Sequence, residues 1–375
     1  TNPQDHYSEL FLNNRDGTFS EVGQALGVAI NEWVKGAVWA DLDNDGWSDL
    51  YVSCHGAENL LYRNEGVDQH GNVSFTEIGA EVGLDEPIFS FHVACFDFDN
   101  DGFQDVFVAD YAFTELELAS EYLGFRPPQH PPRLYRNKGN WEFEDVTEQA
   151  GLQRSIFAMG LNYGDLNNDG FLDLYAATGH PDPRSLFPSL MFLNQAGKSF
   201  ADVTASGGFG HLQKGHGLAF GDVDNDGDQD IYANIGGLFE NDFFWNAYFE
   251  NPGFGNHWVN LKLQGESSNR SAIGARIKLV VRQDGSPREI HRVVSTGGSY
   301  GANSLAQEIG IGSATQIDSL TIDWPASGRT QTFTDLQSDR QYLIKESFDQ
   351  PRIQPYHRVN WPADPSHDGR HRQAH

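Results

Sequence analysis

An acidic motif of nine residues occurs four times in the chain, and this repeat constrains the fold more than any other feature of the sequence. The copies read DLDNDGWSD (41–49), DFDNDGFQD (97–105), DLNNDGFLD (165–173) and DVDNDGDQD (222–230), here loops 1 to 4, and their first residues lie 56, 68 and 57 positions apart. Short runs of small and aromatic residues precede each loop, and alternating apolar stretches such as LYVS and VFVAD follow it. This pattern predicts two strands joined by a tight acidic turn.

A second element follows each acidic hairpin: NLLYRNEG, RLYRNKG, LMFLNQAG and NAYFENPG. After the first three copies it leads into a further strand-like segment such as EFEDVTEQAGL. The unit is therefore expected to be a four-stranded antiparallel sheet, and such a sheet of about 50 residues, repeated along a chain, is typical of a β-propeller blade. The repeated Asn64, Asn137 and Asn194 are expected to serve hairpin turns. The longest spacing contains an insertion that predicts a short helix over 114–123 before a proline cluster.

The two ends of the repeat array are incomplete. Residues 7–30 match the second half of a repeat, with no acidic loop before them, and after NAYFENPG no segment for a fourth strand remains. Either the array is a part of a larger one, or the missing strands arrive from elsewhere, because an exposed sheet edge recruits strands.

The acidic loops are predicted to bind Ca²⁺, at about four sites, in a structural and not a catalytic role. Oxygen side chains at positions 1, 3, 5 and 9 surround one point, glycine at position 6 permits the turn, and position 7 can offer its carbonyl. Ca²⁺ takes about six to eight oxygen ligands, and without a cation the carboxylates repel one another. Loop 3 has an asparagine at position 3, so weaker binding is expected there. The alternative is acidic turns that hold no metal. The predicted side-chain ligands are Asp41, Asp43, Asp45, Asp49, Asp97, Asp99, Asp101, Asp105, Asp165, Asn167, Asp169, Asp173, Asp222, Asp224, Asp226 and Asp230, and the predicted carbonyl ligands are those of Trp47, Phe103, Phe171 and Asp228.

Residues 257–346 differ from the repeats. The segments WVNLKLQG, ARIKLVV, EIHRVVS, SLTIDW and QTFTDL alternate with turns that contain Gly, Ser and Asn. This predicts a small antiparallel β-sandwich or barrel. The stretch Gly297-Gly298-Ser299-Tyr300 is expected to have a structural role.

The acidic repeats resemble the FG-GAP/VCBS-type calcium-binding propeller repeat, and the segments NHWVNLKLQG, SNRSAIGARIKLVV, STGGSYGAN and IGIGSATQIDSLTIDWPASGRTQTF resemble the ASPIC/UnbV domain of cartilage-acidic-protein-like chains. The two resemblances imply an all-β fold, with a propeller of four calcium-loop blades and a partial blade, then a small β domain and an extended tail. The expected boundaries are 1–30 for the partial blade, 31–256 for the blades, 257–346 for the ASPIC/UnbV-like domain and 347–375 for the tail. They also imply an extracellular or cell-surface location and a role in adhesion, matrix or carbohydrate interaction.

The net charge of the chain limits the classes of molecule that it is expected to bind. The chain has 53 acidic and 25 basic residues, a formal net charge of −28, which four Ca²⁺ ions would reduce to −20. Such a field repels nucleic acid and anionic lipid. No apolar run approaches the ~20 residues needed to cross a bilayer, so membrane insertion is not expected. Cys54 and Cys95 could pair, or both could be small buried apolar residues.

The tail, 347–375, is polar, with four prolines and four histidines, and cannot form a core of its own. An ordered tail must therefore dock on its own chain or on a neighbouring copy, and we favour a neighbouring copy. The hypothesis is a homopolymer or filament held partly by this tail. His357, His367, His371 and His375 show no spacing typical of a metal site.

Three functions remain open. The favoured one is a secreted or cell-surface calcium-binding structural or adhesive protein, with copies of itself or extracellular protein or glycan as partners. The second is a lectin-like carbohydrate-binding propeller, with Phe187, Phe239, Phe243, Phe244 and Trp245 as candidate stacking residues. The third is a polysaccharide-active enzyme, with His92, Tyr163, His180 and His216 as candidates. No nucleophile, metalloprotease, P-loop or dinucleotide motif is present, and we expect no enzyme.

Overall fold

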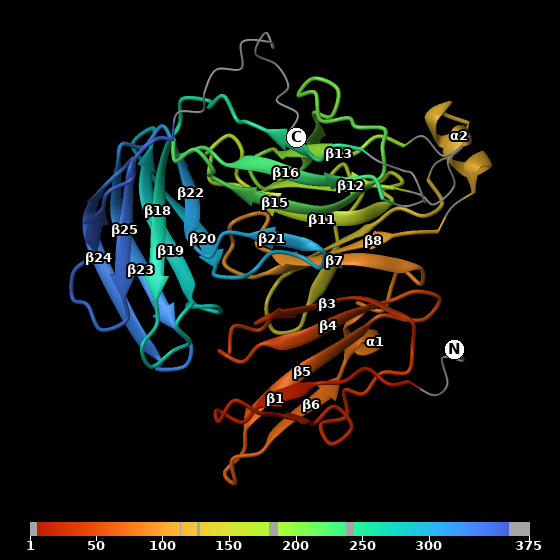
Figure 1. Ribbon diagram of the computed structural model, residues 1–375, viewed down its shortest axis with the longest axis horizontal. Helices are drawn as coiled ribbons and strands as arrows, with labels where there is room; N and C mark the ends of the chain where they lie inside the picture. Colours follow the sequence, from red (N-terminus) through yellow and green to blue (C-terminus); the bar gives the residue numbers. More distant parts are fainter. Residues whose placement is uncertain (1–5, 113, 126–127, 180–186, 238–243, 360–375) are drawn as a thin grey trace.

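The computed structural model describes residues 6–112, 114–125, 128–179, 187–237 and 244–359. Within these ranges the chain is almost entirely β, and its two helices, α1 (Gly79–Val82) and α2 (Glu115–Tyr122), are short. Figure 1 shows a row of sheets that runs from β3 and β4 to β15 and β16, with a separate two-sheet domain, drawn in blue, beside it. The predicted all-β class is confirmed.

Each of the first three acidic loops belongs to a four-stranded antiparallel sheet whose strands follow one another in chain order. Sheet 1 contains β3 (Val34–Ala40), β4 (Asp49–Cys54), β5 (Leu60–Val67) and β6 (Val73–Glu77). Sheet 2 contains β7 (Ser90–Phe96), β8 (Asp105–Asp110), β9 (Arg133–Asn137) and β10 (Phe143–Asp145). Sheet 3 contains β11 (Ala158–Gly164), β12 (Asp173–Thr178), β13 (Leu190–Asn194) and β14 (Phe200–Asp202). Every acidic loop joins the first strand of its sheet to the second, as the sequence predicts.

Sheet 4 is built differently at both of its edges. It has three antiparallel strands of its own, β15 (Gly215–Gly221), β16 (Asp230–Ile235) and β17 (Ala247–Phe249). No fourth outer strand follows β17 in the described residues, in agreement with the sequence. Instead β21 (Gly301–Asn303), which comes from the region after the repeats, pairs in parallel with the first strand, β15.

The sheets pack side by side through their first strands, so that β3 contacts β7, β7 contacts β11, and β11 contacts β15. Apolar clusters fill the spaces between neighbouring sheets, and Phe96 of sheet 2 stacks on Tyr163 of sheet 3 with ring centroids 4.8 Å apart. The approach of β11 to β15 needs a glycine, because a Cβ at Gly160 would lie 1.7 Å from the carbonyl oxygen of His216. These contacts place the described sheets in a row, and no closed ring of sheets is seen within the described residues.

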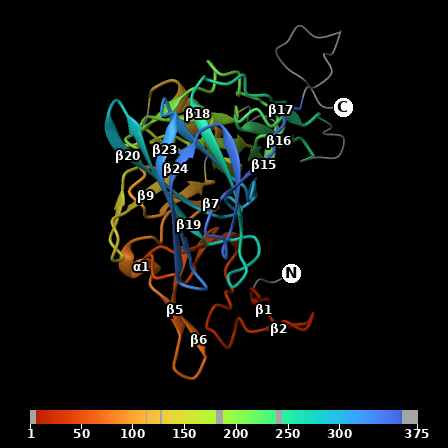
Figure 2. The ribbon, with the colours of Figure 1, turned by 90° about the vertical axis from the view of Figure 1, so that its left-hand side faces the viewer.

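A small hairpin precedes the row. Its strands, β1 (Phe11–Asn13) and β2 (Phe19–Glu21), form a two-stranded sheet, and Figure 2 shows them at the same end of the molecule as β5 and β6. Leu10 and Leu26 pack against an apolar cluster that includes Leu50 and Val52 of sheet 1. The predicted pair of outer strands without inner partners is therefore present within the described residues.

The region after the repeats is a β-sandwich, which we call the sandwich domain. One sheet has the order β22-β18-β25-β26 and the other the order β20-β19-β23-β24, and one apolar core includes residues of both. All of its pairs are antiparallel except β18 with β25, which is parallel, so the predicted antiparallel sandwich holds with one exception. The strands are β18 (His257–Gln264), β19 (Arg276–Gln283), β20 (Ser286–Val293), β22 (Gln307–Gly312), β23 (Gln316–Trp324), β24 (Arg329–Gln337), β25 (Arg340–Lys345) and β26 (Arg352–Gln354).

A segment of the sandwich domain, residues 295–303, crosses to the repeats, and we call it the bridging segment. The Ser299 backbone amide donates to the carbonyl of Val93 at 2.9 Å, and the Val93 amide donates to the Ser299 hydroxyl at 3.1 Å. Asn162 of β11 donates its side-chain amide to Asn303 Oδ1 at 2.7 Å. Figure 1 shows β21, the end of this segment, beside the first strands of sheets 2 to 4. The bridging segment thus ties the two parts of the chain together.

The insertion in the second repeat forms the helix that the sequence predicts. Thr114 caps α2 in a capping box with Glu117: the Glu117 amide donates to the Thr114 hydroxyl, and the Thr114 amide donates to the Glu117 carboxylate. Such a box satisfies backbone donors that the first turn of a helix otherwise leaves free. The helix lies at the edge of the repeats, close to Phe187 through Tyr122.

Candidate metal sites and the surface around them

The acidic loops have the same backbone form in all four copies. The asparagine at position 4 has a positive φ of 54–64°, and the glycine at position 6 has a φ of 87–98°. In loop 1 the position-1 carboxylate, that of Asp41, accepts the amides of Asp45 at 3.0 Å and Gly46 at 3.1 Å. The Asp41 side chain is therefore turned toward the inside of the loop.

Three of the loops bring carboxylates close together. In loops 1 and 2 the aspartates at positions 1, 3 and 5 each offer an oxygen within 4.8 Å of the others, and in loop 4 the aspartates at positions 1, 3 and 9 do so. Loop 3 presents no such trio within the described ranges. There, Asn167 at position 3 donates its side-chain amide to Asp169 at 3.0 Å, which fits the weaker binding expected from the sequence.

Several of these carboxylates are buried, and burial opposes their ionisation. Burial raises the pKa of Asp49, Asp97 and Asp165 to about 7 in each case. The pKa of Asp105 and that of Asp173 are raised well above the ordinary value by the same cause. Buried carboxylates of like charge need a counter-ion or a proton, and oxygen ligands in this number suit a hard cation such as Ca²⁺. The residues present therefore fit the predicted metal.

The aspartate at position 9 also has a role in the backbone of the repeat. In loop 2 one oxygen of Asp105 accepts the amide of Phe98 at 2.9 Å and the other accepts the amide of Asn137 at 2.8 Å. The equivalent residues of the other three loops make the same two bonds. These carboxylates hold the loop against the third strand, whether or not they also bind metal.

The repeated asparagine of the third strand joins neighbouring repeats. The Asn137 side chain accepts the amide of Gly139 at 2.9 Å, which confirms a role in the hairpin turn. Its amide group also donates to two carbonyls, that of Gln104 in its own loop at 3.0 Å and that of Leu42 in the preceding loop at 2.7 Å. Asn194 and Asn251 make the corresponding pairs of bonds. Sequence reasoning recognised the turn and missed the inter-repeat bond.

The sandwich domain packs directly on the acidic loops. Arg292, which is 7 % exposed, donates to Gly170 of loop 3 and to Asn100 of loop 2, both at 3.3 Å, and lies 3.6 Å from the carboxylate of Asp165. Arg276 donates to the carbonyl of Gly102 in loop 2 at 2.9 Å. In loop 3, Arg292 thus supplies part of the positive charge that offsets the aspartates. From the sequence, this charge is attributed to a metal ion alone.

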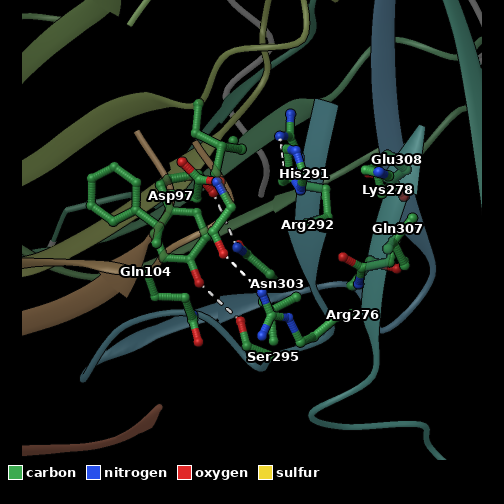
Figure 3. Close-up of a pocket in the computed structure, with 18 of the residues that line it drawn as sticks. Asp97, Gln104, Arg276, Lys278, His291, Arg292, Ser295, Asn303, Gln307 and Glu308 are labelled. Carbon is green, nitrogen blue, oxygen red and sulfur yellow. Dashed lines mark hydrogen bonds between the residues drawn. The ribbon is translucent and has the colours of Figure 1, made fainter. Parts of the chain in front are cut away.

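A polar cavity of about 290 Å³ lies between loop 2 and the sandwich domain. Figure 3 shows Asp97 and Gln104 on one side of it, and Arg276, Lys278 and His291 on the other. Gln104 is 5 % exposed, and its Oε1 atom has no hydrogen-bond partner. An unpaired buried carbonyl oxygen is costly, and this atom is itself covered by its neighbours.

The candidate catalytic residues are engaged elsewhere or lie apart. His92 is fully buried, with Nδ1 2.8 Å from the Ser299 hydroxyl and Nε2 2.6 Å from the Leu161 carbonyl, and burial lowers its pKa to about 3. The Tyr163 hydroxyl bonds to Ser295 at 2.9 Å. His216 borders a different cavity, together with Phe244 and Trp245. His180 lies outside the described residues.

The candidate sugar-stacking residues differ in their exposure to solvent. Phe187 is 3 % exposed and packs on Phe157 at 5.1 Å, so its assignment to a binding surface is wrong. Phe244 and Trp245 are 50 % and 58 % exposed, whereas Phe239 and Phe243 lie outside the described residues. Both cysteines, Cys54 and Cys95, are buried and free.

Comparisons with known proteins identify two families in the chain. The model of the FG-GAP-like repeat matches residues 2–52 and 121–176, and that of the ASPIC and UnbV domain matches residues 265–351. No curated protein matches the chain. Among solved structures, the crystal structure of the Saccharomyces cerevisiae Sqt1 matches with a TM-score of 0.37 and 8 % identity, over 91 % of this chain and 73 % of that one. At this TM-score and identity, the similarity supports no conclusion about the fold or the function of this chain. Within the described residues, no helix is long and apolar enough to span a membrane.

Proposed function

For a chain that carries FG-GAP-like repeats followed by an ASPIC and UnbV domain, we propose the function of an extracellular structural or adhesive protein stiffened by Ca²⁺. The two domain types fit an extracellular or surface protein. Calcium in the acidic loops, the propeller arrangement of the sheets and assembly into a homopolymeric filament all belong to this proposal.

The observation that carries the proposal is the clustering of carboxylates in loops 1, 2 and 4, some of them buried or half-buried. At each site three aspartate oxygens lie within 4.8 Å of one another, and desolvation of Asp41, Asp97 and Asp230 raises their pKa to about 6, 7 and 6. A divalent cation removes both the repulsion and the cost of burying the charge. Extracellular calcium modules bind at about 10⁻⁴–10⁻³ M, a range that suits such a location.

Calcium at these positions would stiffen more than a single turn. Each loop is bonded to the third strand of its own sheet, loops 1 to 3 are also bonded to the next loop, and loops 2 to 4 contact the sandwich domain. A cation that fixes a loop therefore fixes the neighbouring sheet and the sandwich domain as well. This is the behaviour of a scaffold, and we propose no catalytic role for it.

Filament assembly is tested by the mass and shape of the purified protein. Light scattering and electron microscopy are carried out in 2 mM Ca²⁺ and in excess chelator, with the melting temperature measured in parallel. Ordered polymers that fall apart or melt in chelator support the proposal. A monomer of 41.7 kDa in both conditions rejects the filament, and an unchanged melting temperature rejects the calcium sites.

Matched variants separate the metal from general effects of charge. Asp97→Asn removes one carboxylate of loop 2, whereas Asp318→Asn removes a carboxylate that pairs with Arg282 on the exposed side of the sandwich domain. Calcium is expected to raise the melting temperature of the Asp318→Asn variant as it does that of the parent, and to raise that of Asp97→Asn less. Equal responses would contradict a site in loop 2.

The cavity beside loop 2 favours a second candidate, the binding of a saccharide. Its lining includes the cations of Arg276 and Lys278, the hydroxyl of Thr321 and the carboxylate of Asp323. Such a mixture of donors and acceptors suits a small polyhydroxylated ligand. A glycan array tests this candidate, with Lys278→Ala, which removes a partly exposed cation of the lining, as the variant that should lose the signal. Binding that survives in this variant would place the ligand elsewhere.

A further inference from the structure

The described part of the tail docks on its own chain. Strand β26 pairs with β25 in the sandwich domain, and the Tyr356 ring packs on Trp258 with centroids 5.4 Å apart. From there residues 356–359 run over loop 4, where the Val359 amide donates to the carbonyl of Asp224. For these residues no neighbouring copy is needed, whereas residues 360–375 lie outside the described chain.

The position that the tail takes is one that another acidic loop would take. In loops 1 to 3 the asparagine at position 4 donates its side-chain amide to the glycine carbonyl at position 6 of the next loop. The three bonds are Asn44 to Gly102 at 3.2 Å, Asn100 to Gly170 at 2.7 Å and Asn168 to Gly227 at 3.0 Å. Loop 4 has no next loop, and its Asn225 donates to the carbonyl of His357 at 3.3 Å.

The tail also brings its own positive charge to loop 4. The Arg358 guanidinium lies 2.9 Å from the carboxylate of Asp226 and 3.5 Å from that of Asp224. The Tyr356 hydroxyl donates to Asp222 at 2.8 Å. Side chains at positions 1, 3 and 5 of the loop thus all contact the tail, and two of them belong to the carboxylate cluster of loop 4.

We propose that loop 4 is a binding site for the tail peptide Tyr356–Val359, and that Arg358 and Ca²⁺ exclude each other there. In the calcium-free chain the tail caps the last repeat in place of a further loop. Calcium in loop 4 takes the carboxylates from Arg358 and releases the tail from the loop. The proposal rests on calcium binding, which is part of the proposed function.

The charges and exposure of the groups make this exchange feasible. The Arg358 side chain is 60 % exposed, so its ion pairs are weak and a divalent ion at millimolar concentration can replace them. In the described structure no arginine or lysine pairs with the clustered carboxylates of loop 1, whereas Arg136 pairs with Asp99 of loop 2. Loop 1 is therefore expected to bind calcium more tightly than loop 4. Arg352, in the same tail, stacks on Phe348 and contacts no acidic loop in the described structure, so it offers a matched control.

The test measures hydrogen–deuterium exchange of the full-length chain, with peptides that cover 346–359, in chelator and in 5 mM CaCl₂. Calcium is expected to speed exchange in 355–359 at least tenfold, while β25 stays protected. Arg358→Ala should show the fast exchange already in chelator, and Arg352→Ala should behave as the parent in this region. Slower exchange with calcium, or no change in Arg358→Ala, would overturn the proposal.

Calorimetric titration with CaCl₂ provides a second readout. Asp224→Asn identifies the heat that belongs to loop 4, and Arg358→Ala is expected to tighten that site about tenfold without changing the others. An unchanged affinity at loop 4 would overturn the proposal while the calcium sites stand. If no loop of the parent chain binds calcium, both the tail proposal and the proposed function fail. If the loops bind calcium but Arg358→Ala leaves the affinity of loop 4 unchanged, only the tail proposal fails.

Discussion

The inter-repeat bond of Asn137 yields a prediction for which an equivalent asparagine in the same chain, Asn64, serves as the control. Asn137 is fully buried, and its side chain makes three hydrogen bonds, one of them to Leu42 in the preceding loop. Asn64 occupies the same place in sheet 1 but is half-buried, and within the described residues its side chain bonds only to Ser48 and Gly66 of its own repeat. The comparison of Asn137→Ala with Asn64→Ala therefore isolates the bond between repeats.

The expected magnitudes follow from the groups that each change leaves unpaired. A buried carbonyl without a donor costs about 1–3 kcal/mol, and a hydrogen bond that water can replace is worth about 1 kcal/mol. Asn137→Ala strips two buried carbonyls and should reduce the free energy of unfolding by about 2–4 kcal/mol. Asn64→Ala should cost about 1 kcal/mol. Asn194→Ala, which loses bonds to Phe98 and Leu172, should resemble Asn137→Ala.

Urea unfolding in saturating Ca²⁺, followed by tryptophan fluorescence, measures these differences. The comparison of midpoints is valid if the slope with denaturant is the same for all three variants, because the slope reports the surface exposed on unfolding. A loss for Asn64→Ala as large as that for Asn137→Ala would refute the reasoning. It would mean that the turn within each repeat, and not the bond between repeats, carries the stabilisation.

Three further predictions concern the sandwich domain and the loops. Chelation should lower the melting temperature of the parent chain, and scanning calorimetry should show the repeats and the sandwich domain responding together, because the loops bond to both; a transition unchanged in chelator would contradict this. Glu346 is buried; although desolvation raises its pKa, hydrogen bonds from the Ser327 side chain and from the amides of Glu266 and Ser268 outweigh it and lower the pKa to about 2. The ionised Glu346 carboxylate should stabilise the fold by about 2 kcal/mol above pH ~4.5, and this contribution should be lost as the pH falls toward 2. The free energy of unfolding of Glu346→Gln should therefore fall less steeply with decreasing pH than that of the parent. A variant with the parent's pH profile would refute this. In urea titrations carried out in chelator, Arg292→Ala should cost about 3–5 kcal/mol by leaving the buried Asp165 without its cationic partner. Arg282→Ala, at an exposed pair, should cost less than about 1 kcal/mol; similar losses would contradict the buried role of Arg292.

Much of the fold follows from local patterns in the sequence. The acidic loops have glycine at the position that needs a positive φ, and the flanking alternation of apolar residues predicts the strands on either side. The helix after Thr114 follows from its capping residue and the proline cluster beyond it. These features depend on residues that are close together in the chain, so one sequence is enough to find them.

The rest depends on contacts between distant residues. Strand β21 is the tripeptide Gly-Ala-Asn and has no apolar alternation, so only its docking on β15 makes it a strand. The bonds from Asn44 to Gly102 and from Asn225 to the tail join residues that are 58 and 132 positions apart. The asparagine at position 4 was visible in all four loops, but its partner could not be read from the local sequence.

The asparagine bonds from loop to loop all go from one loop to the next along the chain, and this regularity bears on how the repeat array could have evolved. Loops 1 to 3 each donate an asparagine amide forward to the next loop, while Asn137, Asn194 and Asn251 each donate one back to the loop before. A repeat copied and inserted into the row would meet the same partners on both sides, so the array can lengthen by gene duplication without a new interface. Within the described residues, the last repeat differs, because β21 and the tail take the places there that a further repeat would take.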